Sequence, residues 1–388
     1  MSRKPLADIA NPETRLQELE YRIDHDEGRS LLGTLLGRLD DPRPEIRQAA
    51  TAALRNQVGD TVAGIAAALL HQPPAEIERI LEMFNLDVEL EPNDLVRQAA
   101  CAILQNHDAD ESRQALVLAA NDESADVRYR ALLSLSRRPD AGGEELERVV
   151  ASRLQDSDDE VAGVAAELIA REGLVDYTDG VVAVWNRIDH PGADLQFAIA
   201  LAQLYGEHGA SLDDSTIDAI VQQLTDGMDD EETGTTAIRG LVDLGSEYAV
   251  DPLHELLDRW FVHPLLRVEA AAALVQLDDS RGYEEIADAL DHRRRDARGY
   301  AIRAVGRHRI DDHLDRLVEL ADSEDYHNET ALLALVEWGS NEALDAVETL
   351  RRDHSGRKIG VLAERALELR DKHGHFTAEM LDFPSASP

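Results

Sequence analysis

The hydrophobic and polar residues of this chain follow the spacing of amphipathic helices. Apolar residues recur at positions i, i+3, i+4 and i+7, for example in the window that begins at Ala131. One helix of each window is filled with small residues, mostly alanine, and a short polar turn rich in Asp, Pro and Asn supplies its N-cap. No strand pattern competes. The pattern therefore predicts pairs of antiparallel helices. The first helix of a pair ends in a leucine at Leu39, Leu154, Leu224, Leu257, Leu290, Leu320 and Leu350.

One six-residue segment returns several times along the chain. Strong copies are Glu45–Ala50, Leu95–Ala100, Asp126–Ala131, Leu265–Ala270 and Asp296–Ala301, and weaker ones are anchored at Ala165, Ala198, Ala237, Ala331 and Ala363. Seven of the nine intervals between successive alanine anchors span 30–34 residues. Because one helix pair is too small to bury its own apolar face, this period predicts an all-α fold. We expect an α-solenoid of about ten stacked antiparallel helix pairs.

The repeated pattern D-x-x-x-x-V-R-x-x-A-x-x-A-L resembles HEAT repeats, specifically the short variety of phycobilisome-lyase-like proteins. An acid and an arginine six residues apart occur as Asp41/Arg47 and Asp122/Arg128, with Glu91/Arg97 as a conservative version. The resemblance implies that these residues form a ladder between adjacent repeats. It implies a fold, and it carries no information about function.

The repeats divide the chain into three expected regions. Residues 1–27 are expected to hold a capping helix, residues 28–370 the HEAT-like solenoid, and residues 371–388 a disordered tail. The long interval between Ala50 and Ala100 contains a further amphipathic helix near residues 75–86, which is either an insertion or a degenerate repeat. Residues 171–194 are a second irregular stretch.

The charge of the chain restricts its partners. It has 78 acidic and 39 basic side chains, a net charge of −39, and only three of the bases are lysine. Such a charge repels nucleic acid and anionic lipid, and no apolar run or signal segment predicts membrane insertion. We therefore expect a cytoplasmic protein. The Asp-rich, Lys-poor composition resembles that of halophilic archaea, whose proteins depend on strong screening by salt.

No set of catalytic, metal-binding or cofactor-binding residues emerges from the sequence. The single cysteine, Cys101, lies in an alanine-rich helix and is expected to be buried. Di-iron HEAT-repeat enzymes resembling deoxyhypusine hydroxylase use several His-Glu pairs, whereas this chain has one, His254-Glu255. We predict a non-enzyme. The alternative is a metal-dependent hydroxylase or a lyase-like HEAT-repeat enzyme, which stoichiometric iron would favour.

One basic island interrupts the acidic chain. Residues 291–309 contain seven arginines and two aspartates, which leaves a net charge of −44 on the rest. Turns of successive helix pairs become spatial neighbours in a solenoid, so arginine and aromatic residues of the C-terminal turns should form one surface. The alternative is that these arginines pair with nearby carboxylates. The predicted partner-binding residues are Arg259, Trp260, Phe261, His263, Arg293, Arg294, Arg295, Arg298, Arg351 and Arg352.

These observations predict a scaffold or adaptor for other proteins. Short HEAT-like repeats with an acidic, Lys-poor surface resemble haloarchaeal repeat proteins of taxis, which act between the chemotaxis response regulator and the archaellum motor. The resemblance implies chemotaxis and archaellum-switch proteins as partners. No motif in the chain is diagnostic for that role.

Overall fold

A computed structural model describes residues 11–25, 28–56, 59–107, 109–138, 143–188 and 191–381. These residues form helices and no strands, which confirms the predicted all-α class. The chain divides into two compact units. The first comprises Met1–Leu204 with His208–Ser211, and the second Tyr205–Glu207 with Leu212–Pro388. The repeat pattern gives no sign of this division.

The first unit begins with a single helix, which is followed by helix pairs. Its helices are α1 (Pro12–His25), α2 (Gly28–Leu36), α3 (Pro44–Asn56), α4 (Asp60–His71), α5 (Pro74–Met83), α6 (Asp94–Leu104), α7 (Asp110–Ala119), α8 (Ala125–Ser136), α9 (Glu144–Arg153), α10 (Asp159–Arg171), η2 (Val175–Tyr177), α11 (Thr178–Trp185) and α12 (Pro191–Gly206). The last two residues of α12 are assigned to the second unit.

The second unit contains five further pairs. Its helices are α13 (Asp214–Gly227), α14 (Glu231–Leu244), α15 (Ser246–Asp258), α16 (Pro264–Gln276), α17 (Ser280–Leu290), α18 (Arg295–His308), η3 (Asp311–His313), α19 (Leu314–Asp322), α20 (Asn328–Trp338), α21 (Asn341–Asp353), α22 (Lys358–His373) and η4 (Ala378–Leu381). With the pairs of the first unit, the described residues form ten helix pairs, as the repeat pattern predicts.

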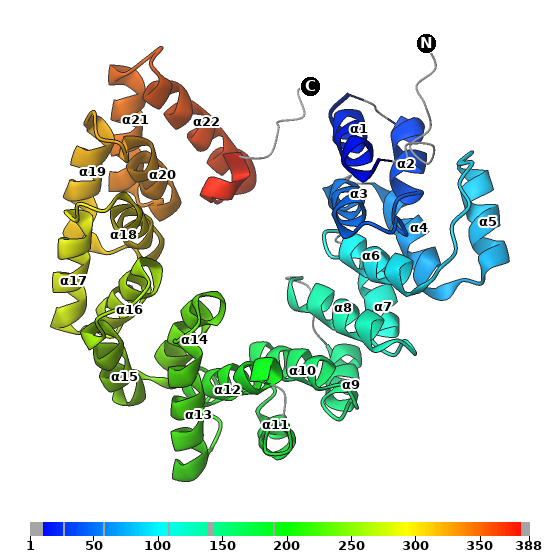
Figure 1. Ribbon diagram of the computed structural model, residues 1–388, viewed down its shortest axis with the longest axis horizontal. Helices are drawn as coiled ribbons and strands as arrows, with labels where there is room; N and C mark the ends of the chain where they lie inside the picture. Colours follow the sequence, from blue (N-terminus) through cyan, green and yellow to red (C-terminus); the bar gives the residue numbers. More distant parts are fainter. Residues whose placement is uncertain are drawn as a thin grey trace. The chain divides into compact units, whose positions relative to one another are not determined.

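Within each unit the second helices of successive pairs pack on one another. In the first unit α3 packs on α6, α6 on α8 and α8 on α10, and in the second the series runs α14, α16, α18, α20 and α22 (Figure 1). Small residues permit this close approach. A Cβ added to Gly306 of α18 would lie 2.7 Å from the Cβ of Ala334 in α20. The alanine-rich pattern therefore reflects contact between helix backbones.

The long interval between Ala50 and Ala100 contains an inserted helix. Helix α4 packs directly against α6, so these two helices are the pair, and α5 lies in the connection between them. After α5 the chain continues without helix over residues 84–93. Val88 of this segment lies against α2, because a Cβ added to Gly33 would be 3.5 Å from it. The structure thus decides between the two alternatives in favour of an insertion.

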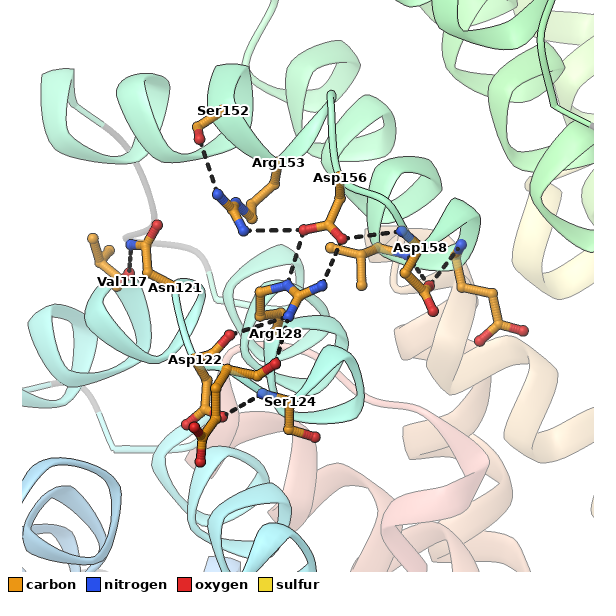
Figure 2. Close-up of polar contacts among 12 residues, drawn as sticks. Val117, Asn121, Asp122, Ser124, Arg128, Ser152, Arg153, Asp156 and Asp158 are labelled. Atoms are coloured by element: carbon orange, nitrogen blue, oxygen red, sulfur yellow. Dashed lines mark hydrogen bonds and ion pairs between the residues drawn. The ribbon is translucent and has the colours of Figure 1, made fainter.

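An arginine–aspartate ladder joins successive repeats of the first unit. Arg97 of α6 donates two hydrogen bonds to the carboxylate of Asp122, at 2.9 and 3.0 Å. Arg128 of α8 donates two to the carboxylate of Asp156, at 2.9 and 2.6 Å, and Figure 2 shows this rung. Each bidentate contact runs from the second helix of one pair to the turn of the next pair. The ladder that the HEAT resemblance implies is therefore present at these two rungs, whereas Arg47 donates to the backbone carbonyl of Asp41 and to no carboxylate among the described residues.

The ladder aspartates also fix their own turns. Asp122 accepts a hydrogen bond from the amide of Ser124 at 2.9 Å, and Asp156 accepts one from the amide of Asp158 at 3.1 Å (Figure 2). Arg128, six residues after Asp122, contacts the backbone carbonyl of Asp122 at 3.1 Å. The arginine of one repeat thus binds the carboxylate of the following repeat. It contacts the aspartate of its own repeat only through the backbone.

The end of the chain differs from the predicted disordered tail 371–388. Helix α22 extends to His373, and η4 follows it. Phe376 is 4% exposed and belongs to the hydrophobic core of the second unit, and Met380 and Leu381 pack against that core. Burial of these apolar side chains orders the segment up to residue 381. Residues 382–388 lie outside the described residues, as do residues 1–10 of the predicted capping region.

Candidate protein-interaction surface

Four turns of the second unit carry the predicted binding residues. We use the name turn edge for residues 259–263, 292–295, 322–327 and 351–354, which lie at or next to the connections between the two helices of the pairs from α15/α16 to α21/α22. The helix pairs succeed one another in Figure 1. All four turns therefore belong to consecutive repeats of one unit.

Side chains connect neighbouring turns of this edge. The guanidinium carbon of Arg295 lies 4.4 Å from the ring centre of Tyr326, and Nε2 of His354 lies 2.8 Å from Oδ1 of Asp322. The rings of His263 and Tyr300 are 6.0 Å apart, which connects the first turn to helix α18. These contacts join the second, third and fourth turns directly, and they join the first turn to the others through helix α18.

Exposed aromatic side chains distinguish the turn edge from the rest of the described surface. Trp260 is 93% exposed, Phe261 is 96% exposed and Tyr326 is 70% exposed. These are the three most exposed large apolar side chains among the described residues. Trp260 and Phe261 stand in the loop between α15 and α16, while Tyr326 is held under the guanidinium of Arg295. Trp260 and Phe261 are neighbours in the first turn, and Tyr326 lies in the third turn of the same edge. Exposed large apolar side chains bordered by charged residues are typical of interaction surfaces.

Much of the basic charge at this edge is paired. Arg294 binds Asp296 at 2.7 Å, Arg298 binds Asp325 at 2.9 Å and Arg351 binds Glu348 at 2.6 Å. Arg259 forms an ion pair with Asp229 of the preceding turn. The alternative interpretation of the island, internal pairing, therefore applies to Arg294 and Arg298, and Arg259 and Arg351 outside the island are paired in the same way.

Three arginines of the edge bind no carboxylate among the described residues. Arg293 is exposed, Arg295 stacks on Tyr326, and Arg352 donates to the backbone carbonyl of Glu348 at 3.2 Å. These three guanidinium groups lie on the same edge as the exposed aromatic residues and can pair with carboxylates of a partner. Tyr326 was recognisable in the sequence as part of the third turn, but the set of predicted partner-binding residues did not include it.

The third turn is fixed by Asp325 and His327. The amide of His327 donates a hydrogen bond to the carboxylate of Asp325 at 2.9 Å. This hydrogen bond and the charges of Arg298 and His327 lower the pKa of the Asp325 carboxyl, although burial acts in the opposite direction. His327 is buried, and burial lowers the pKa of its imidazole. A rigid turn presents Tyr326 in a defined orientation.

The structure assembles no catalytic constellation from the residues considered in the sequence. His254 lies 3.2 Å from Asp279, and the described residues contain no group of three or more metal-ligating side chains. Cys101 is fully buried, as predicted, and burial raises the pKa of its thiol. No helix within the described ranges has the length and apolar character needed to cross a membrane.

The fold and this surface define an α-helical repeat protein. Residues 88–170, which span α6 to α10, match the family model of HEAT repeats, so the chain contains HEAT repeats over this segment. A search of curated proteins found no match.

Solved structures with similar helical repeats include an engineered protein, importin beta and Kap121p bound to Nup53p. The engineered protein is 18% identical with a TM-score of 0.28, and the match covers 94% of this chain and 96% of that chain. Importin beta is 12% identical with a TM-score of 0.35, covering 93% and 58%. The Kap121p complex is 13% identical with a TM-score of 0.32, covering 95% and 49%. This chain thus spans about half the length of the last two proteins.

Proposed function

We propose that this protein is a non-catalytic scaffold that binds a partner protein through the turn edge of its second unit. The observation that carries the proposal is the exposure of Trp260, Phe261 and Tyr326 on one edge. Aromatic and arginine side chains contribute most of the binding energy in protein interfaces, because each removes a large surface from water. Stacked repeats provide the extended surface on which such a contact can form.

The turn edge favours a partner with an apolar pocket bordered by carboxylates. Trp260 and Phe261 would enter the pocket, while Arg293, Arg295 and Arg352 would pair with the acidic rim. Arg259 and Arg294 already have carboxylate partners and would contribute less.

Binding is tested with the double variant Trp260→Ser/Phe261→Ser. The wild-type protein serves as bait at native salt, and mass spectrometry identifies a captured protein, which is then purified for titration calorimetry. We expect the double variant to weaken the affinity at least 100-fold, because each buried aromatic anchor contributes about 2 kcal/mol or more. Charge reversal of Arg293, Arg294 and Arg295 should weaken it further while helicity is kept.

The matched control is Met83→Ser. Met83 of α5 is 69% exposed and lies in the first unit, so its replacement also removes an exposed apolar side chain. We expect wild-type affinity for this control. Equal affinity of the wild type, the control and the double variant would refute the proposal.

The process that we propose is taxis signalling in the cytoplasm, between the chemotaxis system and the archaellum motor. The support is the resemblance of the short repeats and of the acidic, Lys-poor composition to haloarchaeal taxis proteins. A deletion strain tests this role: we expect loss of normal switching of the swimming direction. Normal switching would exclude the taxis role and leave the binding proposal to its own test.

We further propose an origin in a salt-accumulating archaeon. A net charge of −39 requires screening, and the Debye length grows from about 3 Å in molar salt to about 10 Å at 0.1 M. Dialysis from molar KCl to about 0.1 M should therefore reduce the helical circular dichroism signal. An unchanged signal would contradict the proposed origin.

A further inference from the structure

A groove of about 360 Å³ lies on the second helices of the first unit. It is formed by α3, α6 and α8 together with the turn before α3. Its polar lining residues are Arg47, Gln48, Thr51, Arg55, Gln98 and Arg130, and no lining residue is acidic. This composition is unusual in a chain whose acidic side chains outnumber the basic ones two to one.

The arginines of the groove lack the carboxylate partners that other arginines of the unit have. The side chains of Arg55 and Arg130 form no ion pair or hydrogen bond among the described residues, and Nε of Arg55 is buried without a partner. Among the described residues, the side chain of Arg47 donates one hydrogen bond, to the neutral carbonyl of Asp41 at 2.7 Å. By contrast, carboxylates bind the following arginines of the same unit: Arg15, Arg38, Arg97, Arg128 and Arg153.

A cationic groove without carboxylates can accept an anion from outside the chain. Desolvating a guanidinium costs free energy unless an acceptor replaces the lost water, and the surrounding acidic surface supplies none inside the groove. The planar fork of a guanidinium matches carboxylate and phosphate oxygens, and the amides of Gln48 and Gln98 are further donors.

We propose that this groove binds a small anion that carries two acidic groups, either phosphate or carboxylate. The volume lies at the lower end of the range for small-molecule sites, which fits a compact ligand. Two or three guanidinium groups around one groove favour a ligand with more than one negative charge. The site lies in the first unit, so it is independent of the turn edge in the second.

Titration calorimetry with inorganic pyrophosphate and with citrate tests the site on the full chain. The two probes share the required charge and distinguish the phosphate class from the carboxylate class. We expect saturable binding of at least one probe with one site per chain. Each of the variants Arg55→Met and Arg130→Met should weaken the affinity about tenfold or more, because each removes a charge-assisted hydrogen-bonding group.

A third variant lowers the positive charge of the groove without changing the size of a side chain. Gln98→Glu adds a carboxylate to the lining, where it would pair with the arginines and repel the anion. We expect an affinity loss of at least tenfold. Because Gln and Glu have nearly equal size and helix propensity, circular dichroism and the melting temperature should stay close to those of the wild type.

The matched control is Arg79→Met. Arg79 of α5 belongs to the same unit but is exposed, binds Glu76 at 2.7 Å and does not line the groove. We expect it to bind the probe as the wild type does. Absence of saturable binding for both probes, or equal affinity of the wild type, Arg55→Met and Arg130→Met, would overturn the proposal.

Discussion

The rung between Arg128 and Asp156 offers a test of what holds adjacent repeats together. The side chain of Asp156 is 2% exposed and that of Arg128 is 10% exposed. Besides the two bonds from Arg128, the carboxylate accepts one from Arg153 at 3.0 Å and one from the amide of Asp158 at 3.1 Å. In Asp156→Asn the size is kept, but one acceptor oxygen becomes a donor that faces guanidinium donors.

The structure indicates a loss of about 3 kcal/mol in the free energy of unfolding. Removing one partner of a buried ion pair costs about 3–5 kcal/mol, since the remaining charge loses its compensation. The lower figure applies because Arg128 keeps hydrogen bonds to the carbonyls of Asp122 and Glu123, both at 3.1 Å. For a unit of this size, about 3 kcal/mol corresponds to a decrease of roughly 6–12 °C in melting temperature.

Thermal unfolding in molar KCl measures the effect, with Glu123→Gln as control. Glu123 is 91% exposed and its carboxylate stands 3.9 Å from Arg97, so this variant removes one negative charge and a long, solvent-exposed ion pair. The two bidentate bonds from Arg97 to Asp122 stay intact. We expect the control within about 0.5 kcal/mol of the wild type. Equal melting temperatures of Asp156→Asn and Glu123→Gln would refute a stabilising ladder. The double variant with Arg128→Met should cost less than the sum of the single variants, because the second change removes a charge that has already lost its partner.

Acid provides a second measure of the same rung. Burial alone would raise the pKa of the Asp156 carboxyl, but the hydrogen bonds from Arg128 and from the amide of Asp158, with the charges of Arg128 and Arg153, lower it below its usual value. Because the pKa is lower in the folded state than in the unfolded state, the carboxylate stabilises the fold above about pH 4. This contribution is lost as the pH falls through the folded-state pKa. The difference between the wild type and Asp156→Asn should therefore shrink on acidification below about pH 4.

Three further predictions concern single side chains. Burial, followed by the charge of Glu207 and opposed by Arg239, raises the pKa of Asp243 to about 6. The protonated form is therefore favoured in the fold, and the stability it provides at low pH is lost as the pH rises through about 6. Asp243→Asn should stabilise the protein at pH 7.5 by roughly 1 kcal/mol, allowing for solvent screening, and should give no gain in stability below about pH 4. An equal gain at both pH values would contradict a raised pKa of Asp243. Cys101 is fully buried, so its thiol should not react with an aromatic disulfide reagent in the native protein and should react at once after denaturation. A fast reaction in the native protein would contradict its burial. Phe376→Ala should lower the free energy of unfolding by about 2–3 kcal/mol, measured by thermal or chemical unfolding. The control Val361→Ala, at a 56% exposed position of α22, should lower it by less than about 0.5 kcal/mol. Equal losses would show that the segment after α22 does not contribute to the core.

The repeat architecture could be predicted from the sequence because its cause is local and periodic. Each second helix must approach its neighbours closely, so alanines such as Ala131 and Ala165 recur at the spacing of one helix pair, and both are fully buried. The insertion of α5 could not be decided in this way. An amphipathic helix looks the same in sequence whether it pairs with a neighbour or extends from a connection, and only the packing of α4 against α6 distinguishes the two.

Segments that depend on a few distant contacts were less predictable. The last residues read as a polar, proline-containing tail, yet Phe376, Met380 and Leu381 pack against the core of the second unit. The ladder presents the same difficulty. Its acid and arginine are recognisable six residues apart, but the carboxylate that Arg128 binds lies 28 residues further along the chain.

The two proposed sites differ in how far the charge pattern of the sequence could indicate them. The basic island is conspicuous in sequence, but ion pairs such as Arg298 with Asp325 neutralise much of it, and exposed aromatic residues remain as the distinguishing feature of the turn edge. Arg55 and Arg130 are 75 positions apart and are inconspicuous in sequence. They become significant only because three helices place them at one groove without a carboxylate. In a chain with so many acidic side chains, most arginines are expected to find a carboxylate partner within the chain. A partly buried arginine that has no carboxylate partner is therefore the stronger indication of a ligand site.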